Sequence, residues 1–162
     1  MGKIEAKLLA IGLELPQPMK LPSAQSVRLP FTPVLVRGKR VLISGMGPIN
    51  ADGSLAEPRG KVGADLTVEQ GYQAARLVAL NILSALKREL GDLDRVTAWV
   101  RVFGMVNAAP GFTQQPAVIN GFSDLILELW GPDAGAHARS AVGMASLPMN
   151  IPVEIEAEVE IE

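Results

Sequence analysis

Cysteine is absent from this chain of 162 residues, and histidine occurs once, as His137. The lack of cysteine excludes disulfide bonds, thiolate zinc sites and a cysteine nucleophile, and it fits the reducing cytoplasm, where we expect the protein to act. A single histidine argues against a metal site built from imidazoles. We therefore expect neither a metal nor any other cofactor.

The chain also lacks a run of basic residues, and its formal net charge is −2. Nucleic acid is not an expected partner, because phosphate binding needs clustered Lys and Arg. No stretch is apolar for long enough to span a bilayer, and Glu5 and Glu14 interrupt the apolar N-terminal segment, which makes it a poor signal peptide. A composition of 48% hydrophobic and 20% charged residues indicates a globular protein.

The length predicts one domain spanning residues 1–162, in which residues 1–28 form an N-terminal extension. A short helix is expected at 3–13, followed by an extended arm at 15–30, which is rich in Pro and Ser. Two β-rich runs on either side of Gly38 predict a hairpin.

The rest of the chain shows helical and strand periodicity in alternation. Thr67 and Gln70 match a capping box, and Gly91 follows the last apolar position of the helix that they begin. The further elements are expected at these positions: a strand at 95–107, a helix at 116–130, a strand at 140–146 and a final strand at 152–162.

The resulting order β-β-α-β-α-β-β predicts an α+β fold, a two-layer sandwich of a mixed β-sheet with two helices on one face. Two layers leave the second face of the sheet open. Strand alternation assigns Trp99 and Phe103 to that face. We therefore expect a partner chain to cover it, as in a closed ring of subunits.

The last strand alternates apolar residues with glutamates, from Val153 and Glu154 to Ile161 and Glu162. One face of the strand is therefore entirely acidic. The later acids step away from Glu154 at roughly 6.6 Å per pair of residues, so they cannot share a role with it. For them we expect a solvated face or pairing at a subunit interface with a basic residue such as Arg95 or Arg101.

Arg139 begins a strand directly after a Gly-rich loop. Its planar fork could bind a carboxylate bidentately beyond the sheet edge. The alternative is a surface arginine that pairs with one of the terminal glutamates, and spacing alone favours that alternative. His137, two residues earlier, is expected to be an exposed loop residue rather than part of a pocket. Met105, Met144 and Met149 are expected to fill the core.

The segment HARSAVGMASLPMNIPVEIEAE, residues 137–158, resembles the signature of the Rid family, also called YjgF or L-PSP proteins. In that signature an Arg-Ser/Thr opens one strand, a Leu-Pro follows, and Glu-Ile-Glu-Ala starts the next. VLISGMGP at 41–48 and PAVINGFSDL at 116–125 are similar to two further family segments. IGLELP at 11–16 and the stretches 60–83 and 91–96 resemble the longer-chain, endoribonuclease-like branch.

The resemblance implies a chorismate-mutase-like homotrimer whose sites lie at subunit interfaces. It also implies hydrolysis of reactive 2-enamines and 2-imines of amino acids to 2-keto acids and ammonia. By position in the motifs, Arg139 is expected to clamp the substrate carboxylate and Glu154 to handle the attacking water. The other expected substrate-binding residues are Ala141 through its backbone, Asn120, Ser44, Gly45 and Phe31.

The chain departs from the family pattern at two of these positions and at a third beside them. Phe31 stands where a tyrosine is common, Met46 replaces the usual glutamine, and Ala141 replaces a cysteine. A non-catalytic trimer that binds a 2-keto acid or a related carboxylate therefore remains the alternative function. Ribonuclease activity is disfavoured by the lack of a basic stripe and of a histidine pair, and chorismate mutase activity would rest on the fold alone.

Overall fold

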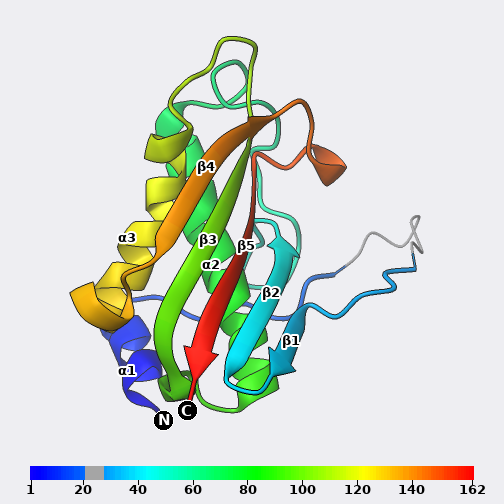
Figure 1. Cartoon of the computed structure of the whole chain (residues 1–162). Coiled ribbons are helices and arrows are strands. Elements are labelled where there is room, and N and C mark those ends of the chain that lie inside the picture. The colour runs from blue at the N-terminus through cyan, green and yellow to red at the C-terminus, as the bar shows by residue number, and fades with distance from the viewer. Residues whose placement is uncertain (21–27) are drawn as a thin grey trace.

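The computed structural model describes residues 1–20 and 28–162 of the chain (Figure 1). The predicted order β-β-α-β-α-β-β is confirmed, and one short helix precedes it. The elements are α1 (Lys3–Ala10), β1 (Val34–Arg37), β2 (Arg40–Met46), α2 (Val68–Leu90), β3 (Val96–Asn107), α3 (Gln115–Ala134), β4 (Ala138–Met144) and β5 (Val153–Ile161), with short 3-10 turns at Leu93–Arg95 and Pro148–Asn150. Of the arm predicted at 15–30, residues 21–27 lie outside the described residues.

The strands form one sheet in the order β1-β2-β5-β3-β4. β3 and β4 run parallel, and the other neighbouring pairs are antiparallel, so the predicted mixed sheet is confirmed. A parallel pair needs a long crossover, which α3 supplies between β3 and β4. Helices α2 and α3 lie together behind the sheet in Figure 1, which gives the predicted two-layer α+β sandwich.

Helix α2 begins at the predicted capping box, in which Thr67 and Gln70 exchange side-chain to backbone hydrogen bonds. Every residue from Val78 to Leu86 is buried, so the helix is covered on more than one side there. The chain segment after α1 accounts for part of this cover, because Ser84 Oγ donates a 2.6 Å hydrogen bond to the carbonyl oxygen of Pro16.

Two glycines allow α3 to pack closely against its neighbours. A Cβ atom on Gly121 would lie 2.0 Å from the carbonyl oxygen of Tyr72 in α2. A Cβ atom on Gly104 of β3 would lie 2.6 Å from Ile119 Cγ1. Larger residues at either position would push α3 outward. These close contacts hold the first half of α3 beside the edge strand β4.

The assignment of Trp99 to the open face of the sheet is wrong. Trp99 is 3% exposed and packs edge-to-face against Phe122 and Trp130 on the helical side. The reason is a β-bulge: Trp99 pairs with Val159, but the next paired residue of β3 is Arg101, so Val100 is an extra residue that breaks the alternation. Beyond the bulge Phe103 does lie on the open face, opposite Glu156.

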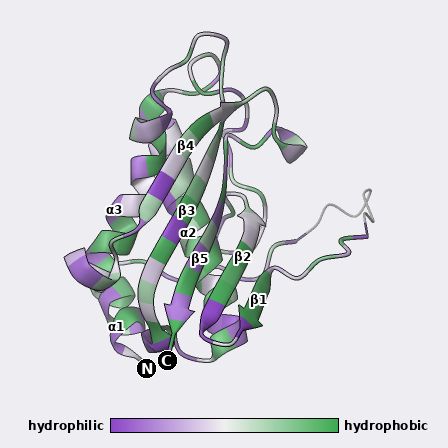
Figure 2. Ribbon diagram, in the orientation of Figure 1, coloured by the Kyte–Doolittle hydropathy of each residue, from purple (hydrophilic) through white to green (hydrophobic). Residues whose placement is uncertain are grey.

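The open face is turned toward the viewer in Figure 1, and none of the described helices α1, α2 and α3 covers it. It carries the glutamates of β5, which alternate with buried Val153, Ile155 and Val159. Strands β3 and β4 show both hydrophilic and hydrophobic bands in Figure 2. One acid pairs within the chain, since Arg40 Nε donates to Glu158 Oε1 at 2.5 Å.

The upper part of the open face holds a small second core. Met105 and Ile151 are buried there, and Met144 and Met149 pack against them, which confirms that these methionines fill core space. Lower down, between β2, β3 and β5, the face is hollowed by a depression of about 300 Å³. Its lining includes Leu42, which is 40% exposed and hence an apolar side chain left uncovered in the single chain.

Candidate functional site

Arg139 lies on β4, at the edge of the sheet, and its guanidinium reaches the first half of α3. Its register partner on β3 is Val102, which is fully buried on the helical side. Nη1 donates to Asn120 Oδ1 at 2.9 Å and to Ser123 Oγ at 3.1 Å, and Nη2 donates to the carbonyl oxygen of Pro116 at 3.4 Å. The alternative of a surface arginine that pairs with a terminal glutamate is therefore wrong.

The three contacts leave part of the Arg139 guanidinium free to bind a ligand. A guanidinium has five N–H donors, and both donors of Nη1 are used. Within the described residues no acceptor is recorded for Nε, and Nη2 has one contact for its two hydrogens, so a pair of donors, one on Nε and one on Nη2, remains available. Such a pair matches the two oxygens of a carboxylate.

The anchors of Arg139 are neutral oxygens. In the described part of the chain no carboxylate lies within ion-pair distance of its guanidinium. Burial lowers the pKa of Arg139, and the charge of the nearby Asp124 carboxylate partly offsets this effect. The Asp124 carboxylate is itself engaged by the Tyr72 hydroxyl, which donates to Oδ2 at 2.8 Å. Arg139 is therefore a partly desolvated cation that forms no ion pair with a carboxylate of residues 1–20 and 28–162.

Asn120 and Ala141 lie with Arg139, and we call these three residues the Arg139 cluster. Asn120 is exposed on α3, and because its Oδ1 accepts from Arg139, its amide N–H groups are directed elsewhere. Ala141 follows Arg139 on the same face of β4 and packs against the main core. β4 ends the strand order, so one of its edges pairs with no other described strand.

Glu154 lies at the start of β5, on the open face of the sheet, where a bulge in β2 brings the backbone close to it. Ile43 pairs with Ala157 and Met46 with Ile155, so β2 carries one residue more than β5 in this interval. The extra length places Gly45 against the acid: a Cβ atom there would lie 3.1 Å from Glu154 Cδ. Gly45 thus provides the space that the carboxyl group occupies.

Burial raises the pKa of Glu154, and the negative charge of Glu156 adds to the rise. No hydrogen bond to the Glu154 carboxyl group is recorded within residues 1–20 and 28–162. A carboxyl group with a raised pKa in a partly dry position is better suited to exchange protons than an ordinary exposed glutamate.

Ser44 and Phe31 complete the second group, and we call Glu154, Gly45, Ser44 and Phe31 the Glu154 cluster. Ser44 Oγ donates to the carbonyl oxygen of Thr32 at 2.8 Å, which ties the chain entering β1 to β2. Phe31 precedes that residue and is 53% exposed. The Phe31 ring is therefore not buried in the single chain.

The raised pKa of Glu154 predicts a stability effect. The folded state holds the proton of Glu154 more tightly than the unfolded state, so wild-type stability falls as pH rises above the ordinary glutamate value of about 4.3. Glu154→Gln removes this penalty, and we expect its Tm at pH 7 to be about 2–4 °C above wild type. The gain should shrink at pH 4. Thermal melts of both proteins at the two pH values test this, and an equal or lower Tm at pH 7 would contradict it.

The two clusters do not meet within one chain. Arg139 pairs with Val102, whose side chain is in the helical core, whereas Glu154 pairs with Met105 on the open face. Strand β3 also separates β4 from β5. One chain therefore presents the two clusters on opposite faces of its sheet.

Sequence reasoning missed Ser123 and misjudged His137. Ser123 is 8% exposed, and its hydroxyl contacts both Arg139 Nη1 and His137 Nε2. His137 is half-buried rather than an exposed loop residue, and its Nδ1 lies 2.7 Å from the carbonyl oxygen of Gly135. The position of Ser123 three residues after Asn120, on the same face of a helix, is the signal that could have identified it.

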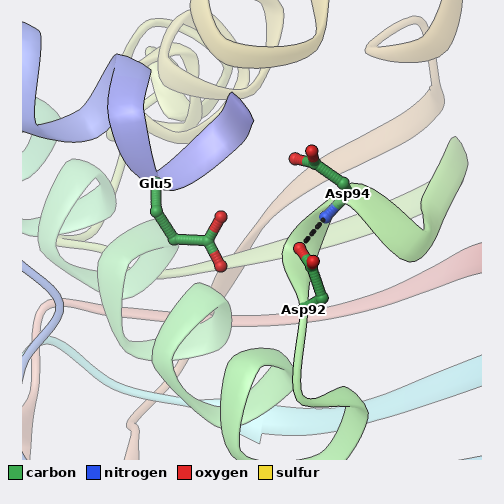
Figure 3. Close-up of side chains that lie close together, drawn as sticks. All are labelled: Glu5, Asp92 and Asp94. Atoms are coloured by element: carbon green, nitrogen blue, oxygen red, sulfur yellow. Dashed lines mark hydrogen bonds between the residues drawn. The ribbon is translucent and has the colours of Figure 1, made fainter. Parts of the chain in front are cut away.

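Glu5, Asp92 and Asp94 form a separate acidic group near the N-terminus (Figure 3). Each has a structural partner: Asp94 accepts from the first backbone N–H groups of α1, Asp92 accepts from Asp94 N, and Glu5 pairs with Lys87 at 2.5 Å. The acidic group connects α1 to the segment between α2 and β3.

None of the described helices is long and apolar enough to cross a membrane.

The comparisons with known proteins cover almost the whole chain. A family model described as "YjgF/chorismate_mutase-like, putative endoribonuclease" matches residues 5–157. The chain belongs to the YjgF family, which is also called the Rid family. The resemblance that the motifs at 41–48, 116–125 and 137–158 indicate is thereby confirmed.

Relatives of this YjgF-family protein share its full length. Protein TCP17 of Trypanosoma cruzi is 41% identical over 160 residues, which is 99% of this chain and 95% of TCP17. The crystal structure of Atu1372 from Agrobacterium tumefaciens has a TM-score of 0.86 at 39% identity, and the match covers 98% of this chain and 92% of the Atu1372 chain. A crystal structure from Shewanella oneidensis has a TM-score of 0.87 at 32% identity, and the match covers 99% of this chain and 100% of the Shewanella chain. The chorismate-mutase-like fold is thus confirmed.

Proposed function

We propose that this YjgF-family protein hydrolyses 2-imino acids, and the 2-enamines that tautomerise to them, to 2-keto acids and ammonia. The observation that carries the proposal is the Arg139 guanidinium, partly desolvated, anchored by neutral oxygens and without a carboxylate partner among the described residues. A cation held in this way suits a small carboxylate ligand. Neither the binding nor the reaction requires a cofactor.

The substrate carboxylate would bind along the edge formed by Nε–H and Nη2–H of Arg139. Each charge-assisted hydrogen bond contributes about 1.5–3 kcal/mol when it is shielded from water. Asn120, which contacts Nη1, and Ala141, which follows Arg139 on the same face of β4, would contact the rest of the ligand. Binding through the carboxylate leaves C2 and its nitrogen directed toward the catalytic acid.

The chemistry consumes one water and releases one ammonia. The water oxygen bonds to C2 as the C=N π bond breaks, and the nitrogen takes a proton, which gives a carbinolamine. The C–N bond then breaks, ammonia leaves, and the hydroxyl group becomes the keto group. In the first step Glu154 accepts a proton from the attacking water and passes it to the imine nitrogen. In the second step it accepts the hydroxyl proton and passes it to the departing nitrogen. A carboxyl group with a raised pKa can perform both transfers.

The two clusters lie on opposite faces of one chain, so we propose that they meet between neighbouring chains of a homotrimer. The Arg139 cluster of one chain would face the Glu154 cluster of the next. The open face favours such contact, because it exposes the apolar side chain of Leu42 and leaves Phe103 only half-buried. Closure of three copies would also remove water around Glu154.

A non-catalytic carboxylate-binding trimer is the second candidate function, and Phe31 favours it. A phenylalanine at that position offers no hydroxyl to hold a water or a substrate. Met46, which follows Gly45, packs against the main core and likewise offers no polar group to the Glu154 cluster. Under this alternative Arg139 binds the ligand in the same way and Glu154 moves no proton.

A coupled assay separates the two candidates. A dehydratase generates the imine of serine or threonine in situ, and the decay of the imine is followed with and without this protein. Faster decay supports the deaminase. Binding of the 2-keto acid by calorimetry without faster decay supports the non-catalytic trimer, and absence of both contradicts the carboxylate site.

A further inference from the structure

The guanidinium of Arg139 is held by a chain of hydrogen bonds that begins at the end of α3. His137 Nδ1 lies 2.7 Å from the carbonyl oxygen of Gly135, and its Nε2 lies 2.9 Å from Ser123 Oγ. Ser123 Oγ in turn accepts from Arg139 Nη1 at 3.1 Å. We call this series, Gly135 to His137 to Ser123 to Arg139, the His137 chain.

The direction of each hydrogen bond in the His137 chain follows from its two ends. The Gly135 carbonyl can only accept, so His137 Nδ1 carries the hydrogen. In the neutral imidazole Nε2 is then an acceptor, and Ser123 donates its hydroxyl hydrogen to it. This leaves the lone pairs of Ser123 Oγ for Arg139, which can only donate. The Nδ1–H tautomer satisfies every group.

The Gly135 end of the His137 chain is rigid. The backbone of α3 is interrupted at Gly131, whose φ is 80°, and a short turn follows it to Gly135. A Cβ atom on Gly135 would lie 2.5 Å from the carbonyl oxygen of Gly131, so this turn closes tightly. Gly135 and Ser123 are both buried. The His137 chain therefore connects Arg139 to a part of the fold with little freedom to move.

We propose that His137 and Ser123 are positioning residues that orient the Arg139 guanidinium for carboxylate binding. The inference rests on the proposed function, because it concerns the same ligand. Without the His137 chain, Nη1 keeps only Asn120 as a partner and Nη2 only the 3.4 Å hydrogen bond to Pro116. The guanidinium can then rotate away from the orientation in which Nε and Nη2 can bind a carboxylate. Neither residue is proposed to touch the ligand or the reacting atoms.

A matched pair of substitutions tests the acceptor at Nε2. The side chain of His137→Gln is long enough to offer an oxygen near Nε2, whereas that of His137→Asn ends near Nδ1 and leaves Ser123 without its acceptor. We expect His137→Asn to raise KM and the Kd for 2-oxobutanoate about three- to tenfold, which is the loss of one neutral hydrogen bond. kcat should stay within about twofold, and His137→Gln should stay near wild type. Ser123→Ala should behave as His137→Asn does.

A second measurement is independent of the ligand. The chain has one histidine, so its ¹⁵N NMR signals need no assignment, and at pH 8.5 we expect the Nδ1–H tautomer. The ¹⁵Nη signals of Arg139 should be separate in wild type and His137→Gln and should merge by rotation in His137→Asn.

The outcomes separate the two proposals. If wild type does not bind 2-oxobutanoate, the proposed function fails and the Nη signals alone decide whether the His137 chain orients Arg139. If wild type binds and Arg139→Ala does not, but His137→Asn binds as well as His137→Gln, the inference is wrong and the proposed function stands. The Nε2–H tautomer would also overturn the inference.

Discussion

Arg139→Ala is expected to lower kcat/KM for imine hydrolysis about 100-fold or more, because it removes two charge-assisted hydrogen bonds to the substrate carboxylate. Most of the loss should appear in binding, since the carboxylate is present in both the ground state and the transition state. The same variant should bind a 2-keto acid too weakly for calorimetry to detect. The coupled dehydratase assay measures the first effect.

Arg139→Lys is the matched control for Arg139→Ala. Lysine keeps the positive charge but lacks the planar fork, so we expect activity between that of wild type and of Arg139→Ala. Circular dichroism and light scattering must show that both variants keep the fold and the assembly of wild type. Full activity in Arg139→Ala with intact assembly would mean that the clamp is assigned to the wrong residue.

Glu154→Gln is expected to lower kcat about 100- to 10,000-fold, the usual contribution of general acid–base catalysis. Glutamine has nearly the same shape as glutamate but cannot take and return a proton. The Kd for 2-oxobutanoate should change less than about threefold, because Arg139 provides most of the binding. Single-turnover kinetics and calorimetry measure the two quantities separately.

Glu156→Gln is the control for Glu154→Gln, because it removes an acid from the same strand and face. Glu156 pairs in register with Phe103 and is exposed, so we expect its substitution to leave kcat within about twofold of wild type. Parallel losses in rate and keto-acid binding in Glu154→Gln would make Glu154 a binding residue. A full rate in Glu154→Gln would favour the non-catalytic alternative.

The fold was predictable from local signals that the structure retains. The capping box at Thr67, the hairpin turn at Gly38 and the alternation in β5 each specify an element within a few residues of its true bounds. Alternation also assigns the glutamates of β5 to one face correctly, because β5 itself contains no extra residue. In such segments the pattern and the backbone agree.

The errors arise where the backbone departs from regular pairing. The extra residue Val100 moves Trp99 from the expected open face into the helical core, and no residue type in that stretch signals a bulge. The bulge in β2 likewise brings Gly45 against Glu154, which alternation could not predict. A strand pattern assumes a constant period of two, and one inserted residue puts the residues before it and after it out of phase with each other.

The candidate site was predictable only in part, for a related reason. The motifs identify Arg139 and Glu154, but the sequence does not reveal that they face opposite sides of the sheet. Ser123 resembles any serine on an amphipathic helix, and its contact with Arg139 depends on the packing of α3 against β4. Long-range contacts of this kind leave no local pattern in a single sequence.

The central claim is that Arg139 of one chain acts together with Glu154 of a neighbour. Subunit mixing tests it most directly: Arg139→Ala and Glu154→Gln chains, each inactive alone, are unfolded, combined in equal amounts and refolded, with each variant refolded alone as the control. If three chains close a ring, about a quarter of the interfaces then contain both native residues, so we expect about a quarter of wild-type activity. Activity that stays at the level of the separate variants, in mixtures that light scattering shows to be assembled, would contradict the account.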